Sequence, residues 1–328
     1  MLDTHSRTQM PMAPPGGEWQ EQSFGLAFPP SFAPQLQASE YLEFVLSRAA
    51  GGMPAAALRC CGTGESCDWY HGAWPVLRVL NLVASPDWHG EFYVRATGDY
   101  AAAHPGELRV LVSGTADATI IDHLRLGLGP FDSARVRVDV IDICETPLAL
   151  VRDYVCEYDP GFEVETIKAD ARRLVDGGVS AGCYDLIVAD AFLTRFSEPD
   201  KFKVLDQWAR VLKGGGQVIT ACRIGGNQKM QAMPEDVAEF GDRAVQAYLQ
   251  FGMLDSRVEA MADLCEVRQL AEAYAARMFS VPAGAETIIS LFRSSGFEFR
   301  GAGQTFERDW TSGEHRPTEY ARIVAQKP

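Results

Sequence analysis

Acidic residues follow several apolar runs that we expect to form strands. Asp142 ends the run VRVDVID, Asp170 follows FEVETIKA, and Asp190 ends YDLIVAD. A carboxylate in the place of Asp142 can accept hydrogen bonds from both hydroxyls of a ribose, and Asp170 could accept one from the exocyclic amine of an adenine. The first run, ELRVLV, leads into the small residues Ser113 to Ala118, which would let a ligand approach the backbone closely. Together these residues predict an adenosine site.

A second group of residues suited to chemistry is aromatic and lies upstream of these strands. It is concentrated in DWYHGAW and continues at WHGEFY. Aromatic faces attract cations, and a Tyr or His tip can orient an acceptor atom. The alternative is that the rings simply pack two helices together, and the sequence leaves both interpretations open. The expected substrate-binding residues are Trp69, Tyr70, His71, Trp74, Tyr93 and, at the end of the run GGQVITACR, Arg223.

The eight cysteines are expected to be reduced thiols. Cys60, Cys61, Cys67 and His71 lie close enough in sequence to suggest a metal site. Their spacing contains no C-x2-C pair of the kind that holds zinc, so we predict no metal.

Composition and charge narrow the class of protein. The chain has 328 residues, 47% of them hydrophobic, and a net charge of −14. These values are typical of a globular protein, and the negative charge argues against nucleic acid as a partner. No apolar run approaches the length of a membrane span, and the first residues lack the apolar core of a signal peptide. We therefore expect a soluble, cytoplasmic protein with no membrane partner.

The order of apolar and amphipathic segments predicts five regions. Strand-like runs alternate with helix-length segments in the central part, which is typical of a doubly wound, Rossmann-like α/β sheet. Helical periodicity dominates before and after that part. The predicted regions are a disordered or extended arm over 1–35, a helical lid over 36–104, the α/β core over 105–226, a helical insertion acting as a second lid over 227–280, and a helix with a β-hairpin that completes the core over 281–328.

This order of motifs resembles the class I S-adenosylmethionine-dependent methyltransferases, including the turn LKGGGQVI into the fifth strand. The first loop departs from the family pattern because it contains a single glycine. The resemblance implies that S-adenosylmethionine is the cofactor, with one group of residues under its methionine portion, others at the ribose and the adenine, and others beside the sulfonium. In that order these residues are Ser113, Gly114, Thr115 and Ala116; Asp142 and Ile143; Asp170 and Ala171; and Asp190, Ala191 and Phe192.

The expected activity is methyl transfer to a small molecule enclosed by the two lids, because the donor is already activated and the protein must align the acceptor and exclude water. We favour nitrogen of an amine or guanidine as the acceptor, with Tyr70, His71 and Asp190 as catalytic candidates. Asp68 is a further carboxylate, and His89 would join His71 as a base for a hydroxyl acceptor.

Other functions remain open at this point. They are O- or C-methylation of a small natural product, a nicotinamide-dependent oxidoreductase, and a non-catalytic binding protein with the same fold. The oxidoreductase would carry G-x-G-x-x-G after the first strand, where this chain has SGTADAT. A homodimer is also expected as an assembly.

Overall fold

The computed structural model describes most of the chain after the N-terminal arm. The described residues are 40–47, 67–129, 135–158, 162–225, 230–231, 234–280, 282–308 and 317–328. The arm predicted over 1–35, together with Cys60 and Cys61, lies outside them.

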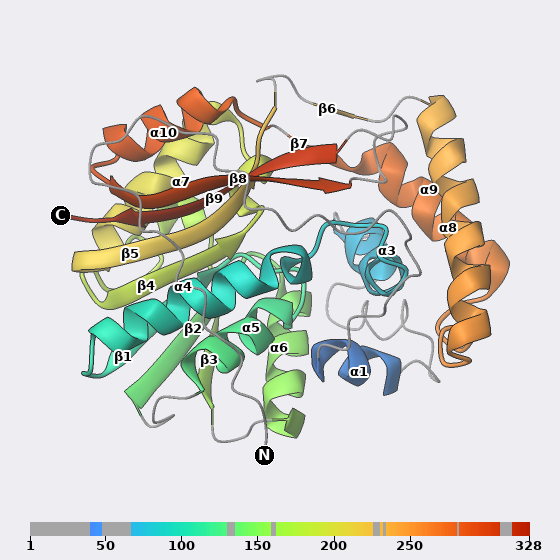
Figure 1. The fold of residues 1–328 in the computed structure, drawn as a ribbon, viewed down its shortest axis with the longest axis horizontal. Coiled ribbons are helices and arrows are strands. Elements are labelled where there is room, and N and C mark those ends of the chain that lie inside the picture. The colour runs from blue at the N-terminus through green and yellow to red at the C-terminus, as the bar shows by residue number, and fades with distance from the viewer. Residues whose placement is uncertain are drawn as a thin grey trace, which may run out of the picture.

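A seven-stranded sheet forms the centre of the molecule (Figure 1), in the order β3-β2-β1-β4-β5-β9-β8. The first five strands of that order are parallel, and β9 runs antiparallel to both β5 and β8. The chain moves outward from β1 to β3 and then returns to β4, so the strand order reverses between β1 and β4. This arrangement confirms the predicted doubly wound α/β fold. The strands are β1 Leu108–Ser113, β2 Val136–Asp142, β3 Glu163–Lys168, β4 Tyr184–Asp190, β5 Leu212–Arg223, β8 Glu298–Arg308 and β9 Pro317–Gln326.

Helices cover both faces of the sheet because successive side chains of each buried strand point to opposite faces. Val110 and Val112 belong to a core shared with α4, α5 and α6, whereas Leu111 between them belongs to a core shared with α7 and α10. The helices are α4 Gly90–Ala103, α5 Thr119–Leu128, α6 Glu145–Tyr158, α7 Glu198–Val211 and α10 Ala285–Ser294. Short 3-10 helices are η2 Pro86–His89, η4 Ala171–Arg173 and η5 Phe192–Arg195.

Four further helices lie outside these layers: α3, α8 and α9 lie beyond the carboxyl ends of the parallel strands, where α3 packs against α9 (Figure 1), and α1 packs on the last turns of α6. They are α1 Glu40–Ser47, α3 Asp68–Val79, α8 Pro234–Leu254 and α9 Leu264–Arg277. The segment that contains α8 and α9 is preceded by β6 Met230–Gln231 and followed by β7 Phe279–Ser280, and these two short strands pair with each other. Of the helices within the lid predicted over 36–104, α3 lies at this edge, whereas α4 covers a face of the sheet and α1 packs on α6.

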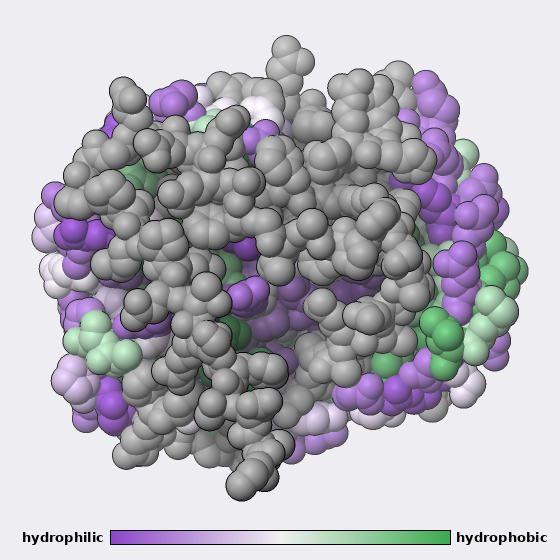
Figure 2. All heavy atoms as spheres, in the orientation of Figure 1, coloured by the Kyte–Doolittle hydropathy of each residue, from purple (hydrophilic) through white to green (hydrophobic). Residues whose placement is uncertain are grey.

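The flank formed by α8 and α9 carries both hydrophilic and hydrophobic surface (Figure 2). Its exposed large apolar residues are Leu249, Met253, Leu254 and Leu264. Across the described residues, none of the helices combines the length and the apolar character that crossing a membrane requires.

The packing of α10 against α7 gives a test of the fold. Phe292 on α10 is fully buried, whereas Phe202 on α7 is 42% exposed. We predict that Phe292→Ala lowers the free energy of unfolding by about 3–5 kcal/mol, because it removes a large core side chain and leaves a cavity. Phe202→Ala is the matched control and should change it by less than about 1 kcal/mol. Denaturant titration measures both values, and equal losses would contradict the assigned packing.

Candidate functional site

The loop after β1 turns sharply at Gly114. This residue has φ +74°, and a side chain there would overlap the ring of Phe192. Its backbone N–H donates to the carbonyl of Ile141 at 2.9 Å, which ties the loop to the end of β2. The hydroxyl of Ser113 instead accepts from the indole N–H of Trp208 at 2.9 Å. The side chain of Ser113 is therefore part of the core, and its neighbours Gly114 and Thr115 form the bend itself.

Asp142 stands at the end of β2 beside this loop. One carboxylate oxygen accepts the backbone N–H of Thr115 at 3.2 Å, and the other accepts that of Cys144 at 2.8 Å. Burial raises the pKa of Asp142 to about 6. Each oxygen keeps a further lone pair, so the carboxylate can accept two more hydrogen bonds. The next residue, Ile143, is 65% exposed and offers an apolar surface beside the carboxylate.

Asp170 lies two residues beyond the end of β3, the strand that pairs with β2. The register places Lys168 opposite Asp142, and the N–H of Ala169 donates to the carbonyl of Asp142 at 3.0 Å. The two acids therefore meet at one edge of the sheet, as the sequence predicts. The carboxylate of Asp170 pairs with Arg172 at 2.8 Å, and the hydrogen bond from that guanidinium holds the pKa of Asp170 below its usual value.

Asp190, at the end of β4, is paired with a tyrosine from a distant helix. The hydroxyl of Tyr93 on α4 donates to Asp190 at 2.6 Å and accepts the backbone N–H of Ala221 at 3.0 Å. Tyr93 is fully buried, and burial raises the pKa of Asp190 to about 6. Tyr93, predicted to bind the substrate, and Asp190, predicted to be catalytic, are thus in direct contact.

The turn after Asp190 is strained at Ala191, which has φ +47°. Such a conformation costs an alanine roughly 1 kcal/mol or more, and residues held in this way gather at functional sites. The N–H of Ala191 donates to the carbonyl of Ala221 at 2.9 Å. The turn delivers Phe192, the first residue of η5, against Gly114. The loops after β1 and β4 are therefore packed together.

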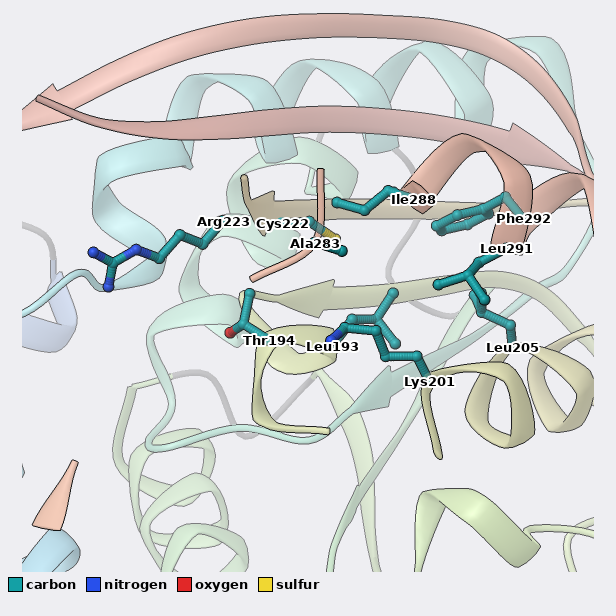
Figure 3. A pocket seen from close by; sticks show the side chains of 10 residues that line it. All are labelled: Leu193, Thr194, Lys201, Leu205, Cys222, Arg223, Ala283, Ile288, Leu291 and Phe292. Carbon is teal, nitrogen blue, oxygen red and sulfur yellow. The ribbon is translucent and has the colours of Figure 1, made fainter. Parts of the chain in front are cut away.

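A largely apolar pocket lies between η5 and α10 (Figure 3). It is enclosed by residues of η5, α7, β5 and α10. The ammonium of the buried Lys201 donates to the carbonyl of Phe196 at 2.8 Å. The guanidinium of Arg223 points away from the other lining residues (Figure 3). The lining residues are Leu193, Thr194, Lys201, Leu205, Cys222, Arg223, Ala283, Ile288, Leu291 and Phe292.

The aromatic residues of α3 pack against α9. The ring of Tyr70 stacks on Trp74 with centroids 5.3 Å apart and on Tyr274 at 5.9 Å. Trp69 contacts Tyr274 at 5.9 Å as well. The indole N–H of Trp74 donates to Asp117 in the loop before α5 at 2.8 Å. These rings join the helices that lie over the edge of the sheet.

Burial lowers the pKa of the two histidines considered as bases. The pKa of His71 falls to about 4 and that of His89 to about 3. His89 packs on the ring of Tyr320 at 4.9 Å and lies 3.3 Å from the guanidinium of Arg322, both on β9. Both imidazoles are neutral at pH 7 and are weak bases.

A buried ionic network that sequence reasoning missed fixes α3 to the rest of the site. Arg78, 2% exposed in its side chain, lies 2.6 Å from Asp87 and 3.3 Å from Asp117. Asp117 also accepts from the backbone N–H of Thr119 at 2.8 Å. A single arginine inside the apolar run AWPVLRVLNLV is the signal that could have revealed a paired, buried charge.

These features define an α/β domain with two acids at the edge of the sheet where nucleosides bind. Residues 127–216 match the family model of the methyltransferase domain. Over those residues the chain is similar to methyltransferase domains, and S-adenosylmethionine is the cofactor that such a domain would use. A search of curated proteins found no relative that matches the chain.

Several solved structures are similar to the described fold. The cyclase SpnF has 15% identity and a TM-score of 0.46, with 72% of this chain and 80% of that chain covered. A SAM-dependent methyltransferase from Methanosarcina mazei has 16% identity and a TM-score of 0.41, with 67% and 92% covered. Magnesium protoporphyrin IX methyltransferase from Synechocystis PCC 6803, with bound SAH, has 13% identity and a TM-score of 0.42, with 73% and 83% covered.

Removing the buried cation tests the ionic network. Arg78→Met should lower the free energy of unfolding by about 3–5 kcal/mol, because it leaves Asp87 and Asp117 without their cation. Arg137→Met is the control, since that arginine is 65% exposed and pairs with an exposed glutamate; it should cost less than about 1 kcal/mol. Chemical denaturation compares them, and a small loss at Arg78 would show that the network does not stabilise the fold.

Proposed function

We propose that the chain transfers a methyl group from S-adenosylmethionine to the nitrogen of a small amine or guanidine-type acceptor. The observation that carries the proposal is the hydrogen-bonded pair of Tyr93 and Asp190 at the end of β4, beside the loop of Gly114. Bound S-adenosylmethionine would supply an electrophilic methyl group on a sulfonium. The residues of the chain must therefore bind the donor, align the acceptor and receive its proton.

Donor binding would rest chiefly on Asp142. Backbone N–H groups of Thr115 and Cys144 fix its carboxylate, and its remaining lone pairs suit the two ribose hydroxyls. The exposed side chain of Ile143 would pack on the adenine, and Asp170 would accept from the adenine amine. These residues fit a nucleoside because they offer acceptors for its hydroxyls and an apolar surface for its base.

Asp190 would bind the cationic acceptor and take its proton. Tyr93 orients the carboxylate by donating to one oxygen, which leaves the other oxygen for the acceptor. A carboxylate attracts an ammonium or guanidinium and can take one of its N–H protons. Loss of that proton would free the nitrogen lone pair for attack on the methyl carbon, and the carbon–sulfur bond would break so that S-adenosylhomocysteine leaves. His71 and His89 are weaker candidates because burial lowers the pKa of both, so nitrogen is favoured over oxygen.

The small size of the acceptor follows from what covers the edge. Helices α3, α8 and α9 lie beyond the carboxyl ends of the parallel strands (Figure 1). Helices in this place would shield the reacting groups from water once an acceptor is bound, which suits a small ligand better than a macromolecule.

The role of Asp142 is tested by donor binding. Asp142→Asn should weaken the binding of S-adenosylmethionine by about 10- to 100-fold, because hydrogen bonds to a charged acceptor contribute about 1.5–3 kcal/mol. Asp99→Asn, a change at a side chain that is 78% exposed, should leave the affinity unchanged. Calorimetric titration measures both variants, with NAD as a second ligand for the unaltered chain.

Two outcomes of that titration, and one of a methyl-transfer assay, would contradict the proposal. Unchanged affinity in Asp142→Asn would remove Asp142 from the donor site. Tight binding of NAD in place of S-adenosylmethionine would favour an oxidoreductase. Donor binding without transfer to any member of an amine, guanidine and phenol panel would favour a non-catalytic binding protein.

The role of Asp190 gives a prediction on pH. Its carboxylate is ionised above a pKa of about 6, so kcat/KM should rise with pH through about 6 and then level off. Asp190→Asn should lower kcat by about 10²- to 10⁴-fold. Tyr93→Phe removes a hydrogen bond that lowers the pKa of Asp190, so the rising limb should move to higher pH.

Other groups near Asp190 belong to the elements packed around it and are unchanged in these variants, so they do not confound the comparison. They are Asp87 of η2, Asp117 before α5, His123 of α5 and Cys222 of β5. A rate that is flat from pH 5 to 8, or an unmoved limb in Tyr93→Phe, would exclude Asp190 as the proton acceptor.

A further inference from the structure

Two cysteines and a histidine from different parts of the chain converge beside the edge of the sheet. Cys67 is the residue that caps α3, and His71 lies four positions further along the same helix. Residues spaced in this way project from one face of a helix. Cys144 precedes α6 and comes from the loop after β2. The two sulfurs and one imidazole nitrogen all lie within 4.8 Å of one another.

The geometry of the group suits a tetrahedral metal ion. The sulfurs of Cys67 and Cys144 are 3.5 Å apart. A disulfide requires about 2.05 Å between its sulfurs, so the two thiols are not bonded to each other. Two thiolates bound to one Zn²⁺ at about 2.3 Å and a tetrahedral angle stand about 3.8 Å apart. The observed separation needs an adjustment of a few tenths of an ångström to reach that value.

The chemistry of the group selects a thiophilic cation. Thiolate and imidazole ligands favour Zn²⁺ and its neighbours, whereas Mg²⁺ and Ca²⁺ favour oxygen ligands. The backbone N–H of Thr146 points at the sulfur of Cys144 at 3.5 Å, which supplies an outer donor to a ligating thiolate. His71 is 5% exposed, so its imidazole is buried beside the two sulfurs. Both cysteines are partly exposed, which gives an ion a route of entry.

We propose that Cys67, His71 and Cys144 bind one Zn²⁺, with the fourth coordination position open to water or another small ligand. Three protein ligands and an open position are the arrangement found where zinc contacts a reacting molecule. The ion joins the start of α3 to the loop that follows Asp142. Cys144 adjoins the proposed donor site, since its N–H holds Asp142. Metal content can nevertheless be measured without donor or acceptor, so failure of the metal site and failure of the proposed methyl transfer can be told apart.

Metal content of the full-length chain tests the site. Protein that has been reduced and stripped with a chelator is given Zn²⁺, and the bound metal is measured after desalting; we expect one ion per chain. Cys67→Ser, Cys144→Ser and His71→Asn should each weaken binding by at least about 100-fold, because even an outer-sphere partner contributes about 10- to 100-fold. Cys183→Ser and Cys265→Ser, the same change at cysteines outside the group, should bind as the unaltered chain does.

Cobalt provides a second readout that does not depend on activity or on the amount of zinc retained. Co²⁺ should give the absorption of a tetrahedral site with thiolate charge transfer, and both signals should be lost in Cys67→Ser and Cys144→Ser. Circular dichroism of each variant shows whether it remains folded, and the serine variants, which are nearly isosteric, serve where His71→Asn unfolds.

Three results would overturn the site. One is an unaltered chain that retains no zinc. Another is zinc binding that survives loss of Cys144. The third is binding lost in Cys60→Ser or Cys61→Ser and kept in Cys144→Ser, which would assign the metal to the cysteines that are close in sequence.

Discussion

The buried guanidinium of Arg78 fixes the position of α3, on which the rest of the site depends. Taking an arginine and two carboxylates out of water is costly, and the cost is recovered only when Asp87 and Asp117 both reach the cation. Asp117 lies in the loop that starts α5, and Trp74 of α3 donates to the same carboxylate. One arrangement of helix and loop satisfies all of these groups. This arrangement also sets the positions of the aromatic residues of α3 and of the start of that helix.

The parallel register of β1 and β2 sets the second constraint. Ser113 stands opposite Ile141, so the bend at Gly114 falls next to Asp142 and the N–H of Thr115 reaches its carboxylate. The same register between β2 and β3 brings Asp170 to the neighbouring position. The register of the sheet places both acids at this edge.

Because the ends of the strands position these acids, the fold and this edge of the sheet could be predicted from the sequence. Apolar runs that end in Asp142 and Asp190 imply parallel strands whose carboxyl ends share an edge, and local patterns determine where those ends fall. Contacts made by docked helices could not be predicted in the same way. Tyr93 and Asp190 are 97 positions apart, and Cys67 and Cys144 are 77 apart. Such pairs depend on how helices are placed over the sheet, which periodicity within a segment does not specify.

Asp142, Asp170 and Asp190 differ in the groups that surround them, and this difference supports the separate roles that we propose for them. Asp170 is already paired with Arg172, which lowers its pKa and satisfies part of its hydrogen-bonding capacity. In the part of the chain that the structure describes, no arginine or lysine pairs with Asp142 or Asp190; burial raises the pKa of each to about 6. Backbone N–H groups hold Asp142, which leaves a carboxylate suited to neutral hydroxyl donors. The hydroxyl of Tyr93, which carries no charge, holds one oxygen of Asp190 and leaves the other for the cation of the proposed acceptor.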